Sequence, residues 1–290
     1  MALSNLASRV LFAIVAIPVV VGLAYVGGLP LALLLALAGG LAAWEYYSIA
    51  TAAGERPMPI TGTVIAAAIP LAVHGYHVGR FHPPVITLGA TITLIVFGLA
   101  IWWRGVDGRP IGAVAITLFG AVYTGGMLSF AYGLRYHNYA FGAVAGTALV
   151  LYPLLLTWTS DTAAYFVGRA LGRRKLIPSV SPGKTVAGAV GALVASIVVS
   201  WLYARYVLPP MARLSVLPWP SVWFGAVMSV AVQIGDLAES LIKREAGVKD
   251  SSHIIPGHGG LLDRLDSLLF AIPVAYLVFT FPHVFFPVNR

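Results

Sequence analysis

Long apolar stretches separated by short polar segments dominate the chain. The stretches without a charged residue are 10–44, 57–79, 81–103, 110–134, 136–160, 185–204, 214–235 and 267–289. Each is long enough for an α-helix to cross about 30 Å of hydrocarbon, which takes roughly 20 residues. Gly27, Gly28 and Pro30 interrupt the first stretch and favour a turn, so we interpret it as two helices. The pattern predicts nine membrane-spanning helices.

The composition supports an all-α polytopic integral membrane protein. Hydrophobic residues make up 59% of the 290 positions and charged residues 10%, whereas soluble domains are about 25% charged. A transmembrane barrel would require short segments of alternating hydrophobicity, which the long apolar runs do not resemble. A cleaved signal peptide is the alternative for the N-terminus, because Arg9 precedes an apolar run and "ALA" stands at 36–38, but the run is too long for such a peptide. The absence of cysteine excludes disulfides and thiol catalysis.

The basic residues predict an orientation in the membrane. With nine spans, 13 of the 18 Lys and Arg residues fall on the side of the N-terminus and five on the other side. Positive residues accumulate in cytoplasmic loops, so we expect a cytoplasmic N-terminus, a C-terminus on the opposite side and a location in the cell inner (cytoplasmic) membrane. The net charge of +8 then indicates contact with anionic lipid headgroups and no nucleic-acid partner.

The acidic residues are concentrated in the last part of the chain. Glu45, Glu55 and Asp107 are interpreted as loop residues, while six of the ten carboxylates lie within 236–266. Carboxylates at membrane depth usually face a wet cavity or a cation. We divide the chain into an N-terminal transmembrane region (1–135), a middle region (136–213) and a C-terminal catalytic region (214–290).

Helical spacing brings several of these groups together. Asp236, Glu239, Ser240 and Lys243 recur at i, i+3, i+4 and i+7, which places them on one face of a helix. Asp263 and Asp266 are expected at i and i+3 at the start of the last helix. Acidic residues there would also complement the helix dipole, which is the structural alternative.

Polar groups around these carboxylates are suited to metal and phosphate. Carboxylates from separate helices could hold magnesium, whose shell phosphate oxygens normally complete. Gly259 and Gly260 would let the backbone approach a ligand. His258 could contact a ligand or only hydrogen-bond the loop. The cations suited to a polyphosphate are Lys243, Arg244, Lys249 and Arg264.

A second polar segment occupies 157–185. Asp161, Tyr165 and Arg169 share a helix face at i, i+4 and i+8. The "SPGKT" segment resembles the end of a phosphate-binding loop, with Ser181, Lys184 and Thr185 as donors, but it lacks the first glycine of a Walker motif and a preceding strand. A basic cytoplasmic loop that touches lipid headgroups is the alternative interpretation.

The segment "SLIKREAGVKDSSHIIPGHGGLLDRLD" from Ser240 to Asp266 resembles the signature of the CDP-diacylglycerol synthases, also called phosphatidate cytidylyltransferases. "SDTAAYFVGR" and "SPGKT" are similar to the middle region of that family, so the resemblance covers roughly 150–275. Ala163 and Val186 depart from the family pattern, which has Gly and Trp there, and this puts the packing of the phosphate-side loop in doubt. The signature positions filled here are Ser240, Lys243, Arg244, Lys249, Asp250, His258, Gly259, Gly260, Asp263, Arg264 and Asp266.

The resemblance implies a reaction. CTP and phosphatidate would give CDP-diacylglycerol and pyrophosphate in an all-helical membrane enzyme, a homodimer that requires Mg²⁺ and has room for a second cation. Asp236, Asp263 and Asp161 would be metal ligands. Asp161 and Asp266 would line the same cavity. The groups expected to act in catalysis are Asp236, Asp263, Lys243 and Asp266. The groups expected to bind substrate are Asp161, Ser181, Lys184, Arg244, Lys249, Asp250, His258, Gly259, Gly260 and Arg264.

Three other functions compete with this interpretation. A secondary transporter also places carboxylates at membrane depth, but two related halves would be expected. A phosphotransferase that uses a CDP-alcohol would show an Asp-Gly and Ala-Arg cluster, which we do not find in the sequence. A CTP-dependent enzyme that acts on another lipid phosphate or an isoprenoid alcohol is the nearest alternative.

Overall fold

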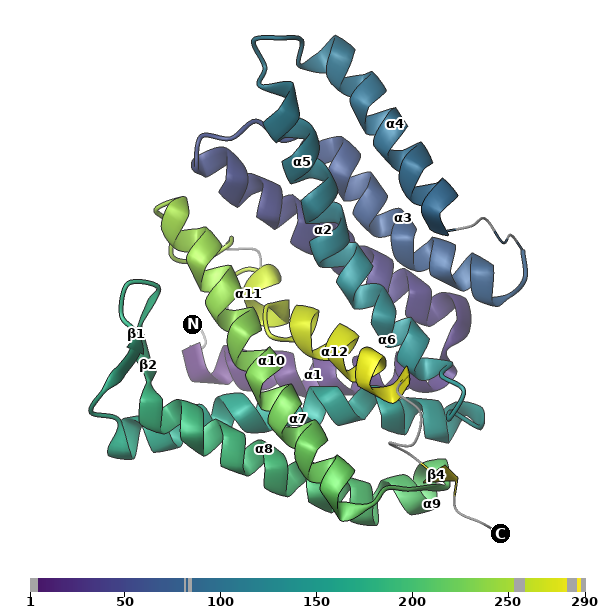
Figure 1. The fold of residues 1–290 in the computed structure, drawn as a ribbon, viewed down its shortest axis with the longest axis vertical. Coiled ribbons are helices and arrows are strands. Elements are labelled where there is room, and N and C mark those ends of the chain that lie inside the picture. The colour runs from purple at the N-terminus through teal and green to yellow at the C-terminus, as the bar shows by residue number, and fades with distance from the viewer. Residues whose placement is uncertain (1–4, 81, 83–84, 253–258, 281–285, 288–290) are drawn as a thin grey trace. The chain divides into compact units, whose positions relative to one another are not determined.

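The computed structural model describes residues 5–80, 82, 85–252, 259–280 and 286–287, and these residues are mainly helical (Figure 1). The helices are α1 (Asn5–Val26), α2 (Gly28–Ala52), α3 (Pro59–His77), α4 (Val85–Trp103), α5 (Pro110–Ala121), the π-helix η1 (Val122–Gly126), α6 (Met127–Arg135), α7 (Gly142–Leu171), α8 (Val186–Tyr206), α9 (Leu208–Ala212), α10 (Pro218–Glu245), α11 (Leu262–Leu265) and α12 (Leu268–Thr280). The strands are β1 (Lys175–Ile177), β2 (Ser181–Thr185), β3 (Leu214–Ser215) and β4 (Phe286–Pro287).

Seven helical segments of the described chain are long and apolar enough to cross a membrane. They are Gly28–Ala52, Pro59–His77, Ile86–Trp103, Pro110–Arg135, Gly142–Leu171, Val186–Tyr206 and Pro218–Glu245. The all-α polytopic architecture is therefore confirmed. The apolar helix Ile14–Val26 is shorter, and α12 has 13 residues. The expected count of nine spans is thus not confirmed, and the orientation stays a prediction.

Two details at helix ends test the sequence interpretation. The predicted turn in the first apolar stretch is confirmed, because α1 ends at Val26, α2 begins at Gly28, and Gly27 has φ +67°. A positive φ is tolerated best by glycine. The expected start of the last helix is wrong, because α11 is a single turn, Asp266 and Ser267 form a turn, and α12 begins at Leu268.

The chain forms two compact units. Unit 1 contains Met1–Ala13, Gly28–Ser129 and Ile242–Leu265, and unit 2 contains Ile14–Gly27, Phe130–Leu241 and Asp266–Arg290, so far as these ranges are described. The chain passes from one unit to the other within α1, α6 and α10, and also between α1 and α2 and directly after α11. Each unit therefore draws on more than one of the three regions into which we divided the sequence.

Small residues allow close helix packing in unit 1. A Cβ atom on Gly39 would lie 2.8 Å from the Cα of Gly125, and one on Gly125 would overlap the carbonyl oxygen of Ala66. Such residues let helix backbones approach one another where hydrophobic burial gives little driving force. The buried hydroxyl of Tyr47 donates to the Thr117 carbonyl at 2.6 Å, which links α2 to α5.

Unit 2 is built on α7 and α8, which lie side by side (Figure 1). Tyr152 of α7 stacks on Tyr203 of α8 with ring centroids 4.4 Å apart, and its hydroxyl donates to the Ser200 carbonyl at 2.8 Å. The hydroxyl of Tyr203 donates to the Ala148 carbonyl at 2.8 Å. These bonds satisfy the polar ends of two buried aromatic rings, as burial requires.

The "SPGKT" segment is a β-strand, and its expected role in binding phosphate stays a prediction. It forms β2, which pairs antiparallel with β1 in a two-stranded hairpin. Thr185 ends the strand and caps α8, because its hydroxyl accepts a hydrogen bond from the amide of Gly188 at 3.1 Å. A threonine in this position satisfies one of the free amides of a helix N-terminus. The hairpin holds Lys184 two residues before the start of α8.

Candidate active site

Unit 2 contains a cavity of about 630 Å³ between α7, the β1–β2 hairpin, α8 and α10. Its charged and polar lining includes Asp161, Arg169, Lys184, Gln233 and Asp236. A cavity of this size is in the range of ligand-binding sites. Both signs of charge are present, which suits a ligand that carries phosphate together with a metal ion.

The predicted polar face of α7 is confirmed. Asp161, Tyr165 and Arg169 all line the cavity, because α7 continues as one helix to Leu171. The Arg169 guanidinium donates to the Tyr165 hydroxyl at 3.0 Å. This bond holds the arginine along the helix, with donors left for a ligand.

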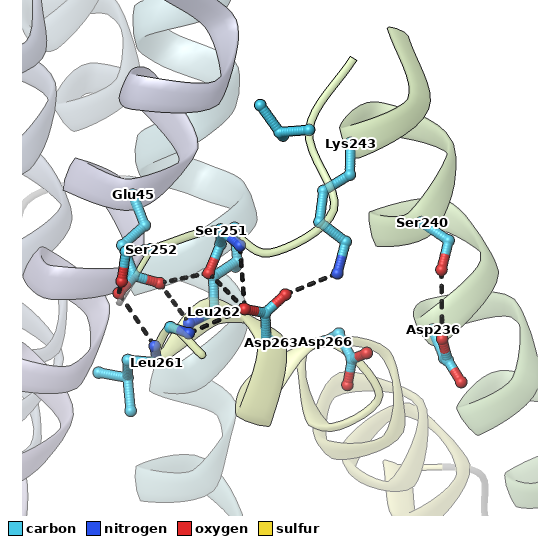
Figure 2. A network of polar contacts seen from close by, with 12 residues as sticks. Glu45, Asp236, Ser240, Lys243, Ser251, Ser252, Leu261, Leu262, Asp263 and Asp266 are labelled. Atoms are coloured by element: carbon cyan, nitrogen blue, oxygen red, sulfur yellow. Dashed lines mark hydrogen bonds and ion pairs between the residues drawn. The ribbon is translucent and has the colours of Figure 1, made fainter. Parts of the chain in front are cut away.

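An ion pair in the cavity joins Lys184 of the hairpin to Asp236 of α10. Their Nζ and Oδ2 atoms are 2.7 Å apart, and their side chains are 25% and 34% exposed. A residue expected to bind substrate is therefore paired with a residue expected to bind metal. Ser240, one turn further along α10, donates weakly to Asp236 at 3.4 Å (Figure 2). Ser181, at the other end of β2, is not among the residues that line the cavity.

The carboxylates of Asp236 and Asp161 also affect the pKa of Asp266. Burial, the charge of Asp236 and, more weakly, that of Asp161 together raise the pKa of Asp266 to about 7, against the lowering effect of a hydrogen bond from the Ser267 amide. Unit 2 thus collects three acidic side chains whose negative charges oppose one another. Such an arrangement favours a bound cation.

The residues of unit 2 fit magnesium if a ligand completes its shell. Among the residues that the structure describes, no group of three His, Cys, Asp or Glu side chains has the arrangement to hold a metal ion by itself. Magnesium, however, normally binds one or two carboxylates together with water and substrate phosphates. Asp236 with Asp161 or Asp266 would supply such a partial set.

In unit 1 the signature residue Asp263 is already saturated with hydrogen bonds (Figure 2). Its Oδ1 atom is 2.6 Å from Lys243 Nζ, and the two side chains are only 8% and 11% exposed. Its Oδ2 atom accepts from the amide of Ser251 at 2.9 Å, the hydroxyl of Ser251 at 3.0 Å and the amide of Gly260 at 2.8 Å. A metal ion on Asp263 would have to replace the lysine. Asp263 is therefore less well prepared for a metal than the carboxylates of unit 2.

The two glycines of the signature are explained by this packing. Gly259 has φ +79°, and a Cβ atom there would lie 2.8 Å from Asp263 Oδ2. A Cβ atom on Gly260 would overlap the hydroxyl of Ser251. The glycines thus let the backbone approach Asp263, whereas we expected an approach to a ligand. His258 lies outside the described residues.

The remaining signature residues are exposed on unit 1. They are Arg244, Lys249, Asp250 and Arg264. Arg244 donates to the carbonyl of Val248 at 3.3 Å. Their expected role in binding substrate stays a prediction.

One prediction about the acidic residues is wrong. Glu45 is not a loop residue: it lies within α2, is 1% exposed, and accepts hydrogen bonds from Ser251, Ser252, Leu261 and Leu262 (Figure 2). A signal was present in the sequence, because the apolar run continues after Glu45 as "YYSIATAA". A single charge inside a span indicates a functional or tightly partnered residue.

Comparisons with known proteins extend the resemblance from the signature segment to nearly the whole chain. The sequence model of the cytidylyltransferase family matches residues 7–281. The phosphatidate cytidylyltransferase of Brucella suis is 33% identical over 275 residues, which cover 95% of this chain and 93% of that protein. The proteins of the same name from Haemophilus influenzae and Bacillus subtilis are 43% and 41% identical over 140 and 136 residues, and these two alignments span about half of each relative, 48% in both. The resemblance inferred from the signature is thereby confirmed, and the chain belongs to the cytidylyltransferase family.

Proposed function

We propose that this protein is a phosphatidate cytidylyltransferase, which converts CTP and phosphatidate to CDP-diacylglycerol and pyrophosphate. The observation that carries the proposal is the 33% identity over 95% of the chain to a relative of that name. The mixed charge of the cavity in unit 2 supports it, because a transfer between two phosphate compounds needs cations for the phosphates and carboxylates for the metal.

The reaction forms one phosphorus–oxygen bond and breaks another. A phosphate oxygen of phosphatidate attacks the α-phosphorus of CTP, and the bond to the β-phosphate oxygen breaks to release pyrophosphate. Phosphate monoesters have a second pKa of about 6, so the nucleophile is already anionic near neutral pH and needs no strong base. The main barrier is then repulsion between two anions, which cationic side chains lower by binding phosphate oxygens.

Lys184, Arg169 and Asp236 are the groups of the unit 2 cavity best suited to these tasks. Lys184 and Arg169 would donate to phosphate oxygens, and Asp236 with Asp161 or Asp266 would hold magnesium. Magnesium would supply charge neutralisation on the triphosphate and on the departing pyrophosphate. The family signature assigns Lys243 and Asp263 of unit 1 to catalysis of cytidylyl transfer.

The two lysine–aspartate pairs give these sites a resting state. Lys184 is paired with Asp236, and Lys243 with Asp263, at 2.7 and 2.6 Å. Each pair is neutral, so the partly buried charges are stabilised before substrate arrives. Asp236 and Asp263 would serve as metal ligands, and Lys184 and Lys243 would donate to phosphate oxygens.

The assembly and location are part of the proposal. Seven apolar helices and bacterial relatives support a multi-pass protein of the cell membrane, and we propose the cytoplasmic membrane with CTP entering from the cytoplasm. A homodimer is proposed from the family resemblance alone. Light scattering of the detergent-solubilised protein would test it, and a monomer mass would contradict it.

A nucleotide panel tests the function. Purified protein is incubated with magnesium, phosphatidate and one of the four ribonucleoside triphosphates, and pyrophosphate and lipid product are measured together. We expect both products in equal amounts with CTP. Pyrophosphate without a nucleotide-containing lipid, or a lipid product with another nucleotide and not with CTP, would contradict the proposal.

A further inference from the structure

Glu45 is a buried carboxylate in a helix that is long and apolar enough to cross the membrane. It lies within α2 and is 1% exposed. An ionised carboxylate in such a place is costly unless hydrogen bonds compensate it. The contacts of Glu45 therefore indicate what the residue is for.

Four donors surround the carboxylate, and all belong to unit 1. Oε1 accepts from the hydroxyl of Ser252 at 2.6 Å and the amide of Leu261 at 2.9 Å. Oε2 accepts from the hydroxyl of Ser251 at 2.8 Å and the amide of Leu262 at 2.7 Å. Hydrogen bonds to an ionised acceptor are about twice as strong as neutral ones. Glu45 thus binds two parts of the signature segment, one before and one after residues 253–258.

The same contacts lead directly to Asp263. The hydroxyl of Ser251 lies 2.8 Å from Glu45 Oε2 and 3.0 Å from Asp263 Oδ2, so it is a donor shared between two carboxylates. Gly260, whose amide donates to Asp263, packs so closely that a Cβ atom there would lie 2.5 Å from Glu45 Oε2. Two of the groups that orient Asp263 are therefore themselves held against Glu45.

We propose that Glu45 is a positioning residue that holds the signature segment so that Asp263 and Lys243 keep their working geometry. The inference rests on the proposed function, in which Asp263 and Lys243 take part in cytidylyl transfer. Glu45 acts through Ser251 and the backbone of residues 260–262 and does not touch substrate. Its removal should slow the reaction while substrate binding changes little.

Glutamine is the most informative substitution because it keeps the shape of the side chain. Each oxygen of Glu45 accepts from one backbone amide and one hydroxyl. A hydroxyl can rotate to become an acceptor, but a backbone N–H cannot. Whichever way the Glu45→Gln amide turns, its NH₂ group would face one backbone N–H, either that of Leu261 or that of Leu262. The segment must then shift.

The experiment compares Glu45→Gln with Glu55→Gln in the full-length protein in detergent. Glu55 has the same charge and lies in the loop after α2, where Arg109 is 3.8 Å away. We expect Glu45→Gln to lower kcat at least about tenfold, because small displacements of reacting groups cost that much or more, with both KM values within about twofold of wild type. Glu55→Gln should behave as wild type.

Two serine variants distinguish the positioning of Asp263 through Ser251 from a general packing role of Glu45. Ser251→Ala removes the donor shared with Asp263, whereas Ser252→Ala removes only a contact to Glu45. We expect the larger loss of kcat in Ser251→Ala, and less than additive loss when it is combined with Glu45→Gln. Where Glu45→Gln does not purify in a folded form, Ser251→Ala decides the matter.

Several outcomes overturn the inference. Wild-type kcat in Glu45→Gln, an effect on KM alone, or equal kcat in the two serine variants would each contradict it. Hydrogen exchange of the amides of Leu261 and Leu262 gives a readout without activity, and it should be faster in Glu45→Gln. If wild-type protein fails to make CDP-diacylglycerol, the proposed function fails, while unchanged exchange in Glu45→Gln would separately overturn the positioning role.

Discussion

At the scale of single residues, the described part of each unit contains a lysine–aspartate pair drawn from the residues that sequence reasoning had selected. Lys184 meets Asp236 in unit 2, and Lys243 meets Asp263 in unit 1. The sequence predicted these residue types but gave them separate tasks, phosphate for the lysines and metal for the aspartates. A linear pattern cannot show such pairing, because the partners are 52 and 20 positions apart.

The aspartates of these pairs are the first test. Asp236→Asn and Asp263→Asn should each lower kcat at least about a hundredfold, because a neutral amide binds magnesium weakly and cannot balance the lysine. Glu245→Gln, an exposed position at the end of α10, is the matched control and should retain most activity. Turnover is measured together with size-exclusion profiles, and equal losses in all three variants, or aggregation of the aspartate variants, would favour a purely structural role.

Asp266 predicts a pH dependence of stability. Its pKa is raised from the ordinary value to about 7, chiefly by burial, so the folded protein holds this proton more tightly than the unfolded chain. The stabilisation from protonation is therefore present at low pH and is lost as pH rises from about 4 to about 7. Without divalent cations, Asp266→Asn should melt above wild type near pH 8, and this advantage should shrink as pH falls towards about 5. An advantage independent of pH would contradict the shift.

At the scale of helices, Arg135 fastens α6 to the end of α1 within unit 2. The side chain is buried, and its Nε and Nη2 atoms donate to the carbonyls of Ala24 and Tyr25 at 2.6 and 3.0 Å. A cation at a helix C-terminus satisfies free carbonyls and complements the dipole. The charge count treated Arg135 only as a basic residue of a loop.

The contact of Arg135 with the end of α1 is tested by Arg135→Met. We expect a loss of about 1.5–3 kcal/mol in unfolding free energy, typical of hydrogen bonds to a charged group, because two carbonyls lose their donor. Arg205→Met, on an exposed position in the last turn of α8, is the control and should melt close to wild type. Thermal unfolding by intrinsic fluorescence measures both, and equal melting of the two variants would show that Arg135 does not hold the helices.

Helix boundaries show which features of the fold were readable from sequence. The turn at Gly27 and the polar face of α7 followed from local rules, since glycine marks the turn and helical spacing marks the face. The hairpin at Lys175–Thr185 and the break before Leu268 did not, because tertiary contacts decide them. Glu45 was misread although the apolar run continues after it. Only its partners could not be predicted, because they lie more than 200 positions away, at Ser251, Ser252, Leu261 and Leu262.

At the scale of the whole molecule, the predicted orientation in the membrane can be tested directly. Thirteen of 18 basic residues fall on one side if the chain crosses nine times. Tags at the N-terminus and within 170–184 should then be protected in intact cells, and a tag after Arg290 should be accessible. The accessibility of each tag to a membrane-impermeant reagent checks this, and termini on the same side would show that the number of spans is even.

The most direct test of the account follows the phosphates of CTP. If the lipid phosphate attacks the α-phosphorus, label in the α-phosphate should appear in the lipid, and label in the γ-phosphate should leave as pyrophosphate. The charges of the unit 2 cavity favour this outcome, because Lys184 and Arg169 can hold a departing pyrophosphate. A CTP-dependent lipid kinase would instead place the γ-label in the lipid and release CDP. Label from the γ-phosphate recovered in the lipid would contradict the proposed reaction.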